Sequence, residues 1–147
     1  MSARLAYLAL PALLLSGCFL QDTASYPLDG RDHAITVKRT QRWPWDSTLV
    51  VEVIVRRQSE CTAGGSFEDV THDAKLLVYR AAEDQHLLVK TGKRYFNVDT
   101  YNCRVDRMKE APEERGDKLG TFMEKDDTFQ FVPAPPRAPG TDEGAAP

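Results

Sequence analysis

The chain has 147 residues and a nearly balanced charge, with 19 Lys and Arg against 22 Asp and Glu and a formal net charge of −3 at pH 7. This length suits one small domain with one hydrophobic core rather than two. The charge balance excludes nucleic acid as the expected main partner, because phosphate binding needs a concentrated positive surface. It also gives no support for electrostatic binding to a membrane surface.

The N-terminal segment has the parts of a secretory signal. Arg4 supplies a positive charge, residues 5–15 are apolar throughout, and two small residues follow them. An apolar run of about 11 residues is too short for a transmembrane helix, which needs about 20. The four residues that close the run, Leu15-Ser16-Gly17-Cys18, resemble the lipobox of a bacterial lipoprotein precursor.

The lipoprotein resemblance implies three processing steps at Cys18. A diacylglyceryl group is transferred to its thiol, the signal peptide 1–17 is cleaved off, and the new N-terminus is acylated, typically with palmitate. Two or three acyl chains anchor a protein stably, whereas one chain is marginal. Phe19 rather than Asp follows the cysteine, and by the sorting rules of the family this favours the outer membrane, facing the periplasm, over the inner membrane. The membrane, reached through this lipid, is therefore an expected partner.

Two further cysteines remain, Cys61 and Cys103. An even pair in an exported chain predicts one disulfide. The bond would close a loop of roughly 43 residues, for which the chain-entropy estimate is about 4 kcal/mol. The chain has no Cys-x-x-Cys motif, so a structural bridge is favoured over a redox-active pair.

The next segment divides into a tether and the start of a β domain. Residues 19–32 show no clear period, so 18–32 is interpreted as the lipidated N-terminus and a tether, with Tyr26 and Leu28 as points that could dock on the domain. A single β domain is expected over 33–132. Alternating apolar residues predict a strand at 34–40 and the strongest strand of the chain at 47–57.

The remaining elements are expected in a simple succession. The stretch 58–73 is interpreted as a loop, because it contains Gly64-Gly65 and many polar residues. After it we expect a hairpin, a long strand, a charged loop, a final hairpin and a disordered tail rich in Pro, Ala and Gly. The first hairpin is expected over 75–80 and 86–91, and the long strand over 94–105. The charged loop is expected over 106–118, the final hairpin over 119–124 and 128–132, and the tail over 133–147.

Seven strand candidates with short connections predict an all-β fold. We expect a small antiparallel sandwich or barrel with one disulfide, in which sequential strands pair as a meander. The alternative is an α+β fold with one short helix near 107–118, because Pro112 suits a first helical turn.

Trp43-Pro44-Trp45 is the most suggestive motif of the domain, and Arg42 precedes it. Pro44 cannot donate to a β ladder, so the motif is expected in a turn or at a bulged edge. Three interpretations are open. The indoles cover one end of the core, or they form with Arg42 a binding edge for a partner or a glycan, or they enter a membrane interface.

The sequence offers no catalytic or metal-binding motif. His33, His72 and His86 match no zinc or metalloprotease spacing, and there is no Gly-x-Ser-x-Gly. We therefore expect no cofactor, no metal and no enzymatic activity. The expected function is that of a membrane-anchored envelope lipoprotein whose periplasmic β domain binds a protein or cell-wall partner. The alternatives are a β-barrel that binds a small molecule or lipid, and an inhibitor of an exogenous hydrolase such as lysozyme.

Overall fold

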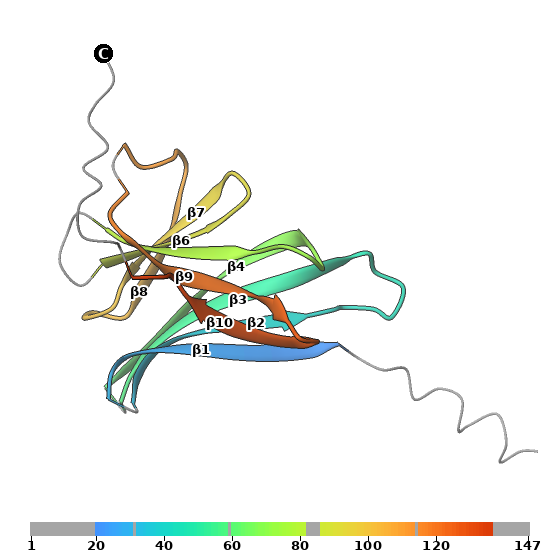
Figure 1. The fold of residues 1–147 in the computed structure, drawn as a ribbon, viewed down its shortest axis with the longest axis horizontal. Helices are drawn as coiled ribbons and strands as arrows, with labels where there is room; N and C mark the ends of the chain where they lie inside the picture. The colour runs from blue at the N-terminus through green and yellow to red at the C-terminus, as the bar shows by residue number, and fades with distance from the viewer. Residues whose placement is uncertain (1–19, 31, 59, 82–85, 114, 137–147) are drawn as a thin grey trace, which may run out of the picture.

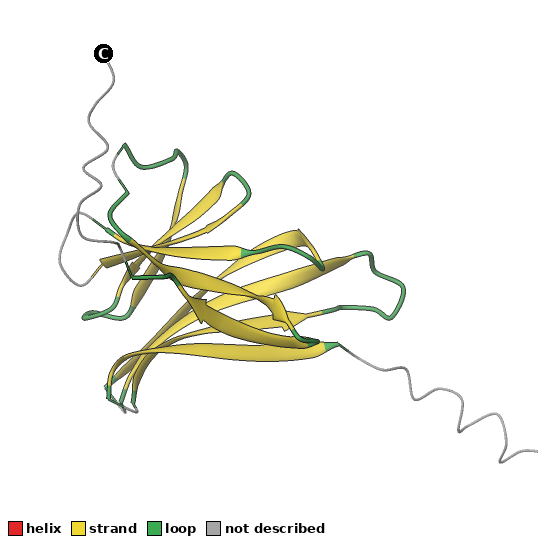
Figure 2. Cartoon of the chain, viewed as in Figure 1, coloured by secondary structure: helices red, strands yellow, loops and turns green. Residues whose placement is uncertain are grey.

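The computed structural model describes residues 20–30, 32–58, 60–81, 86–113 and 115–136. Within these ranges the chain forms ten strands and no helix (Figure 2). The strands are β1 (Gln21–Asp29), β2 (His33–Thr40), β3 (Thr48–Arg57), β4 (Cys61–Thr71), β5 (Leu76–Arg80), β6 (His86–Thr91), β7 (Arg94–Asp99), β8 (Arg104–Met108), β9 (Lys118–Lys125) and β10 (Thr128–Pro133).

The strands form two antiparallel sheets that pack as a sandwich (Figure 1). The four-stranded sheet is a meander in the order β1-β2-β3-β4, and the six-stranded sheet has the order β10-β9-β5-β6-β7-β8. The second sheet departs from the expected meander, because the β9–β10 hairpin returns to pair with β5 rather than with β8. The all-β prediction is confirmed. The α+β alternative with a helix near 107–118 is wrong, because residues 109–113 and 115–117 form a loop after β8.

The core lies between the sheets and follows the alternation of the strands. In β3, Leu49, Val51, Val53 and Val55 all point inward and are almost fully buried, as their period of two predicts. Phe67 of β4 lies beside them in the same sheet and packs on Phe96 of β7 in the opposite sheet, with ring centroids 4.2 Å apart. Rings also close the edge where the two sheets meet, since Tyr26 of β1 stacks on Phe131 of β10.

The segment expected to be a tether instead contains β1. Gln21–Asp29 pairs along its length with β2, so the sheet begins at Gln21 and not at residue 33. Ala24, Tyr26 and Leu28 alternate toward the core cluster, which confirms that Tyr26 and Leu28 dock on the domain. Pro27 is tolerated because β1 is an edge strand of its sheet.

The segment expected to be a loop contains β4. Phe67 and Val70 both point inward although three positions separate them, because the β3–β4 register shifts between Leu49 and Val51 and Asp69 takes a positive φ of 53°. Because of this bulge, the inward residues of β4 do not follow a period of two in the sequence. A Cβ on Gly65 would lie 3.1 Å from the Phe96 ring, so glycine here permits the close approach of the opposite sheet.

The single long strand expected over 94–105 is two strands joined by a tight turn. The Asp99 carboxylate accepts hydrogen bonds from the backbone N–H groups of Tyr101 and Asn102, at 3.0 and 2.9 Å, which is a typical aspartate-initiated turn. Cys103 completes it with a φ of 49°. The remaining predicted strands, including the β5–β6 and β9–β10 hairpins, are present.

Among the described residues no helix has the length and apolar character needed to cross a membrane. The predicted signal peptide 1–17, Cys18 and the tail from 137 onward lie outside the described residues. Pro133, at the start of the expected tail, is the last residue of β10.

Candidate functional site

The two tryptophans lie on the loop that joins β2 to β3, and they point into solvent. Trp43 is 56% exposed and Trp45 is 77% exposed. Their rings stack on one another with centroids 5.5 Å apart and planes within 7°. The interpretation that they cover the end of the core is therefore wrong, because the indoles cover each other instead.

The loop that carries the indoles is held by its own hydrogen bonds. The Gln41 side-chain amide donates to the carbonyl oxygens of Asp46 at 2.8 Å and Pro44 at 3.3 Å. The Asp46 carboxylate accepts from the backbone N–H of Trp43 at 3.2 Å, and the Asp46 N–H donates to the Trp43 carbonyl at 3.0 Å. The stacked pair is thus displayed on a turn whose backbone is already ordered, which lowers the entropy cost of binding.

Arg42 stands beside the pair and faces the bulge of β4. Its guanidinium lies 2.7 Å from the Glu68 carboxylate, in an ion pair whose two side chains are both more than half exposed. A hollow of about 260 Å³ opens between this ion pair and Trp43, and Asp46 and Asp69 contribute to its wall. The structure thus brings together the three residues that the sequence singled out, Arg42, Trp43 and Trp45, on one exposed edge.

The edge lies at the end of the sandwich where the described chain begins. The backbone N–H of Gln41 donates to the carbonyl of Leu20 at 3.0 Å, directly before β1. Figure 1 shows the start of β1 and the β2–β3 loop at the same end of the sandwich, and the β1–β2 and β3–β4 connections at the other. We call the first the leading end and the second the disulfide end.

Arg39 is a residue of this end whose role the sequence did not reveal. It continues the inward face of β2 after Ile35 and Val37, and it is only 3% exposed. Its guanidinium lies 2.6 Å from Asp22 of β1 and 3.3 Å from Glu124 of β9. One buried cation therefore joins the two sheets just below the tryptophan loop.

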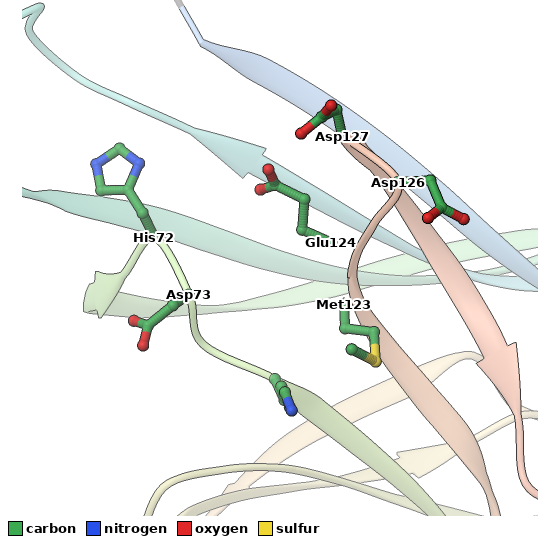
Figure 3. A pocket seen from close by; sticks show the side chains of 7 residues that line it. His72, Asp73, Met123, Glu124, Asp126 and Asp127 are labelled. Atoms are coloured by element: carbon green, nitrogen blue, oxygen red, sulfur yellow. The ribbon is translucent and has the colours of Figure 1, made fainter.

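A second hollow at the leading end, of about 600 Å³, lies between the β4–β5 connection and the β9–β10 turn (Figure 3). Its wall includes His72, Asp73, Glu124, Asp126 and Asp127. His72 and Asp73 are the two central residues of a turn, which the Ala74 N–H closes by donating to the Thr71 carbonyl at 3.1 Å, and Figure 3 shows their side chains directed apart. A hydrogen bond from the Thr71 side chain is the main cause that lowers the pKa of Asp73. No group of His, Cys, Asp or Glu within the described ranges is arranged to hold a metal ion.

The disulfide end is closed by the predicted bridge. Cys61 of β4 and Cys103 of the β7–β8 turn are bonded, with their Cα atoms 5.9 Å apart. The ring of His33 donates from Nε2 to the carbonyl of Thr100 at 2.7 Å, so this histidine also joins the two sheets. Tyr101, which falls within the long strand expected over 94–105, lies in the turn with its ring centroid 4.3 Å from the Arg57 guanidinium.

No protein-family model, no curated protein and no solved structure matches this chain.

Proposed function

We propose that this chain is a lipid-anchored protein of the bacterial cell envelope and that its β-sandwich works by binding rather than by catalysis. The lipobox motif Leu15–Cys18 supports the anchor, and Phe19 after the cysteine supports an outer-membrane position facing the periplasm. The single observation that supports binding is the exposed pair of stacked indoles on an ordered turn, flanked by Arg42. Its partner is an envelope component: a protein, the cell wall or the membrane itself.

The binding edge has the composition of an interaction hot spot. Trp and Arg are the residue types enriched in such spots. Gln41 and Asp46 hold the turn through hydrogen bonds within the loop, so the indoles do not have to be ordered on contact. The space between the sheets is filled by buried apolar side chains, which favours a partner at the surface over a small molecule or lipid held inside a barrel.

Two measurements test the proposal. In the expressing bacterium, Cys18→Ala should leave the precursor uncleaved and without lipid label, and normal labelling of this variant would refute the anchor. Recovery of envelope partners by the lipidated protein should fall in a Trp43→Ala/Trp45→Ala variant. The matched control is Tyr101→Ala, which removes a comparably exposed ring from the disulfide end. Equal recovery by the two variants would contradict the assigned edge.

A hydrolase inhibitor remains the second candidate, because an exposed aromatic pair on a rigid loop also suits an enzyme cleft. Purified mature protein at micromolar concentration should then inhibit lysozyme, and the Trp43→Ala/Trp45→Ala variant should not. Absence of inhibition by the wild-type protein contradicts this candidate.

A further inference from the structure

We propose that the partner of the tryptophan edge is the bilayer that carries the lipid on Cys18, with the Trp43–Trp45 pair seated in its interfacial zone. This inference rests on the proposed lipid anchor, and it names the occupant of the edge. Of the large hydrophobic side chains that are exposed within the described ranges, these two share one loop and Tyr101 lies at the other end.

The anchor leaves almost no tether. The sheet begins at Gln21, and Cys18 precedes Leu20 by only two residues. An extended chain spans at most about 3.6 Å per residue, so the Cα atom of Cys18 lies within about 7 Å of that of Leu20. A lipid on Cys18 therefore holds the leading end of the sandwich directly against the membrane surface.

The tryptophan loop lies at this same end. Gln41, which opens the loop, donates its backbone N–H to the carbonyl of Leu20 at 3.0 Å. The indoles follow within two to four residues and are turned away from the core. Trp is enriched at membrane–water interfaces because its ring is apolar and its N–H is polar. The lipid and the two indoles thus contact the membrane from the same end of the domain.

The charges of the leading end decide which kind of lipid contact this is. Arg42 is paired with Glu68, Asp46 lies within the loop, and Asp126 and Asp127 occupy the neighbouring turn. Lys75 lines the same hollow, but Asp73, Asp126 and Asp127 outnumber it, so this end has no surplus of positive charge to attract anionic headgroups. The contact is therefore made by the indoles themselves, and it should not require anionic lipid.

Intrinsic fluorescence gives a direct test, because Trp43 and Trp45 are the two tryptophans of the whole chain. The lipidated protein is reconstituted into phosphatidylcholine vesicles, and into the same vesicles with brominated acyl chains. We expect bromine to reduce the emission about twofold or more, and iodide in the buffer to quench about threefold less than it does for unlipidated protein in solution, made without residues 1–17 and carrying Cys18→Ala. Adding anionic phosphatidylglycerol should leave both values unchanged.

The matched control moves the reporter to the disulfide end. In Trp43→Phe/Trp45→Phe/Tyr101→Trp, the single indole lies beyond the far end of β3, about 30 Å away for a strand of this length. This variant should float with the vesicles as the wild type does. Its emission should be insensitive to brominated lipid and open to iodide.

Flotation and quenching separate the two proposals. Wild-type protein that fails to float overturns the lipid anchor, and the present inference with it. Protein that floats while its emission ignores brominated lipid overturns the membrane assignment and leaves the anchor standing. Indoles that are shielded from iodide only after cell-wall fragments or an envelope protein are added overturn it too, in favour of that partner. Quenching that appears only with anionic lipid contradicts the uncharged contact.

Discussion

Replacing Arg39 by methionine removes a buried charge from between the two sheets. The guanidinium lies 2.6 Å from Asp22, 3.3 Å from Glu124 and 3.2 Å from the carbonyl of His72. It also sits 4.0 Å from the ring centroid of Phe129. Methionine keeps most of the side-chain volume and removes the charge, so this variant measures the polar contacts with little change in packing.

The expected loss is modest because the partners of Arg39 are not fully buried. A hydrogen bond to a charged group contributes about 1.5–3 kcal/mol, and the contact with Phe129 adds about 0.5–1 kcal/mol. The side chains of Asp22 and Glu124 are 34% and 52% exposed, so water solvates them again when the cation is removed. The Arg39 Nε has no hydrogen-bond partner among the described residues, so removing this desolvated guanidinium offsets part of the stability that the lost contacts contributed. We expect Arg39→Met to lower the free energy of unfolding by about 1–2 kcal/mol and Arg39→Ala by about 3 kcal/mol.

Urea unfolding of a double-mutant cycle checks this magnitude and its origin. Arg39→Met combined with Asp22→Asn should show a coupling energy of about 1 kcal/mol, and combined with Glu124→Gln about half of that, because the second contact is longer and more exposed. The control is Arg42→Met, which breaks the exposed pair with Glu68 and should cost less than about 0.5 kcal/mol. An Arg39→Met cost no larger than that of Arg42→Met would refute the reasoning, as would stronger coupling to Glu124 than to Asp22.

Three further predictions concern the two ends and the β9–β10 hairpin. Cys61→Ala/Cys103→Ala, which opens a bridge across 42 positions of sequence, should lower the free energy of unfolding by about 4 kcal/mol in thermal or urea melts; a loss below about 1 kcal/mol would contradict this. Gly120→Ala should cost more than about 2 kcal/mol, because its Cβ would lie 2.3 Å from a phenylalanine ring carbon and 2.6 Å from a backbone oxygen of β10; a melting temperature unchanged from wild type would show that the hairpin yields. The pKa of Asp73 is lowered, chiefly by the Thr71 hydrogen bond, so the stability that it contributes is present above its ordinary pKa of 3.8 and is lost as pH falls through the lower folded value. Asp73→Asn should therefore be less stable than wild type near neutral pH and equal to it in strong acid, and a constant difference from pH 2 to 7 would refute the assignment.

Strands with an unbroken alternation could be predicted from the sequence, and strands with a local irregularity could not. The four inward positions of β3 are spaced two apart without exception, so one face of a half-buried strand was evident. In β4 the bulge at Asp69 places Phe67 and Val70 on the same face. A pattern search that counts in twos therefore sees no strand, although a glycine inside a strand also indicates close packing against a neighbouring element, as at Gly65 against Phe96.

The first strand was missed for a different reason. Ala24, Tyr26 and Leu28 do alternate toward the core, but small and polar residues and Pro27 dilute the signal. A proline and a weak apolar face are what an edge strand tolerates. The alternation of β1 is too weak to give residues 19–32 a clear period, and for that reason the sequence predicts a tether there.

The candidate site also combines features that the sequence predicts with features that it does not. That Trp43 and Trp45 occupy a turn follows from Pro44 alone, because the reason is local. That they are exposed, and that the turn lies beside Leu20, depends on the pairing of β1 with β2, which composition does not encode. The role of Arg39 depends on contacts with residues 17 and 85 positions away along the chain. Contacts between residues that lie far apart along the chain could therefore not be predicted from this one sequence.

The sandwich is joined across its sheets at both ends, by different means. At the disulfide end the joint is covalent, and the His33 hydrogen bond to Thr100 reinforces it. At the leading end the buried Arg39 joins the sheets, and one of its two carboxylate partners is Asp22, the second residue of β1.

A pull on a lipid at Cys18 would act first on β1, an edge strand that pairs with β2 alone in its sheet. The ion pair with Asp22 holds the start of β1 against β2, and Arg39 also contacts Glu124 of β9 in the second sheet, so these contacts oppose fraying at the point where the proposed anchor would load the domain. Fraying of β1 would also lengthen the path from the lipid to the tryptophan loop. The stability of the Arg39 contacts and the proposed position of the indoles at the membrane therefore depend on the same strand pairing.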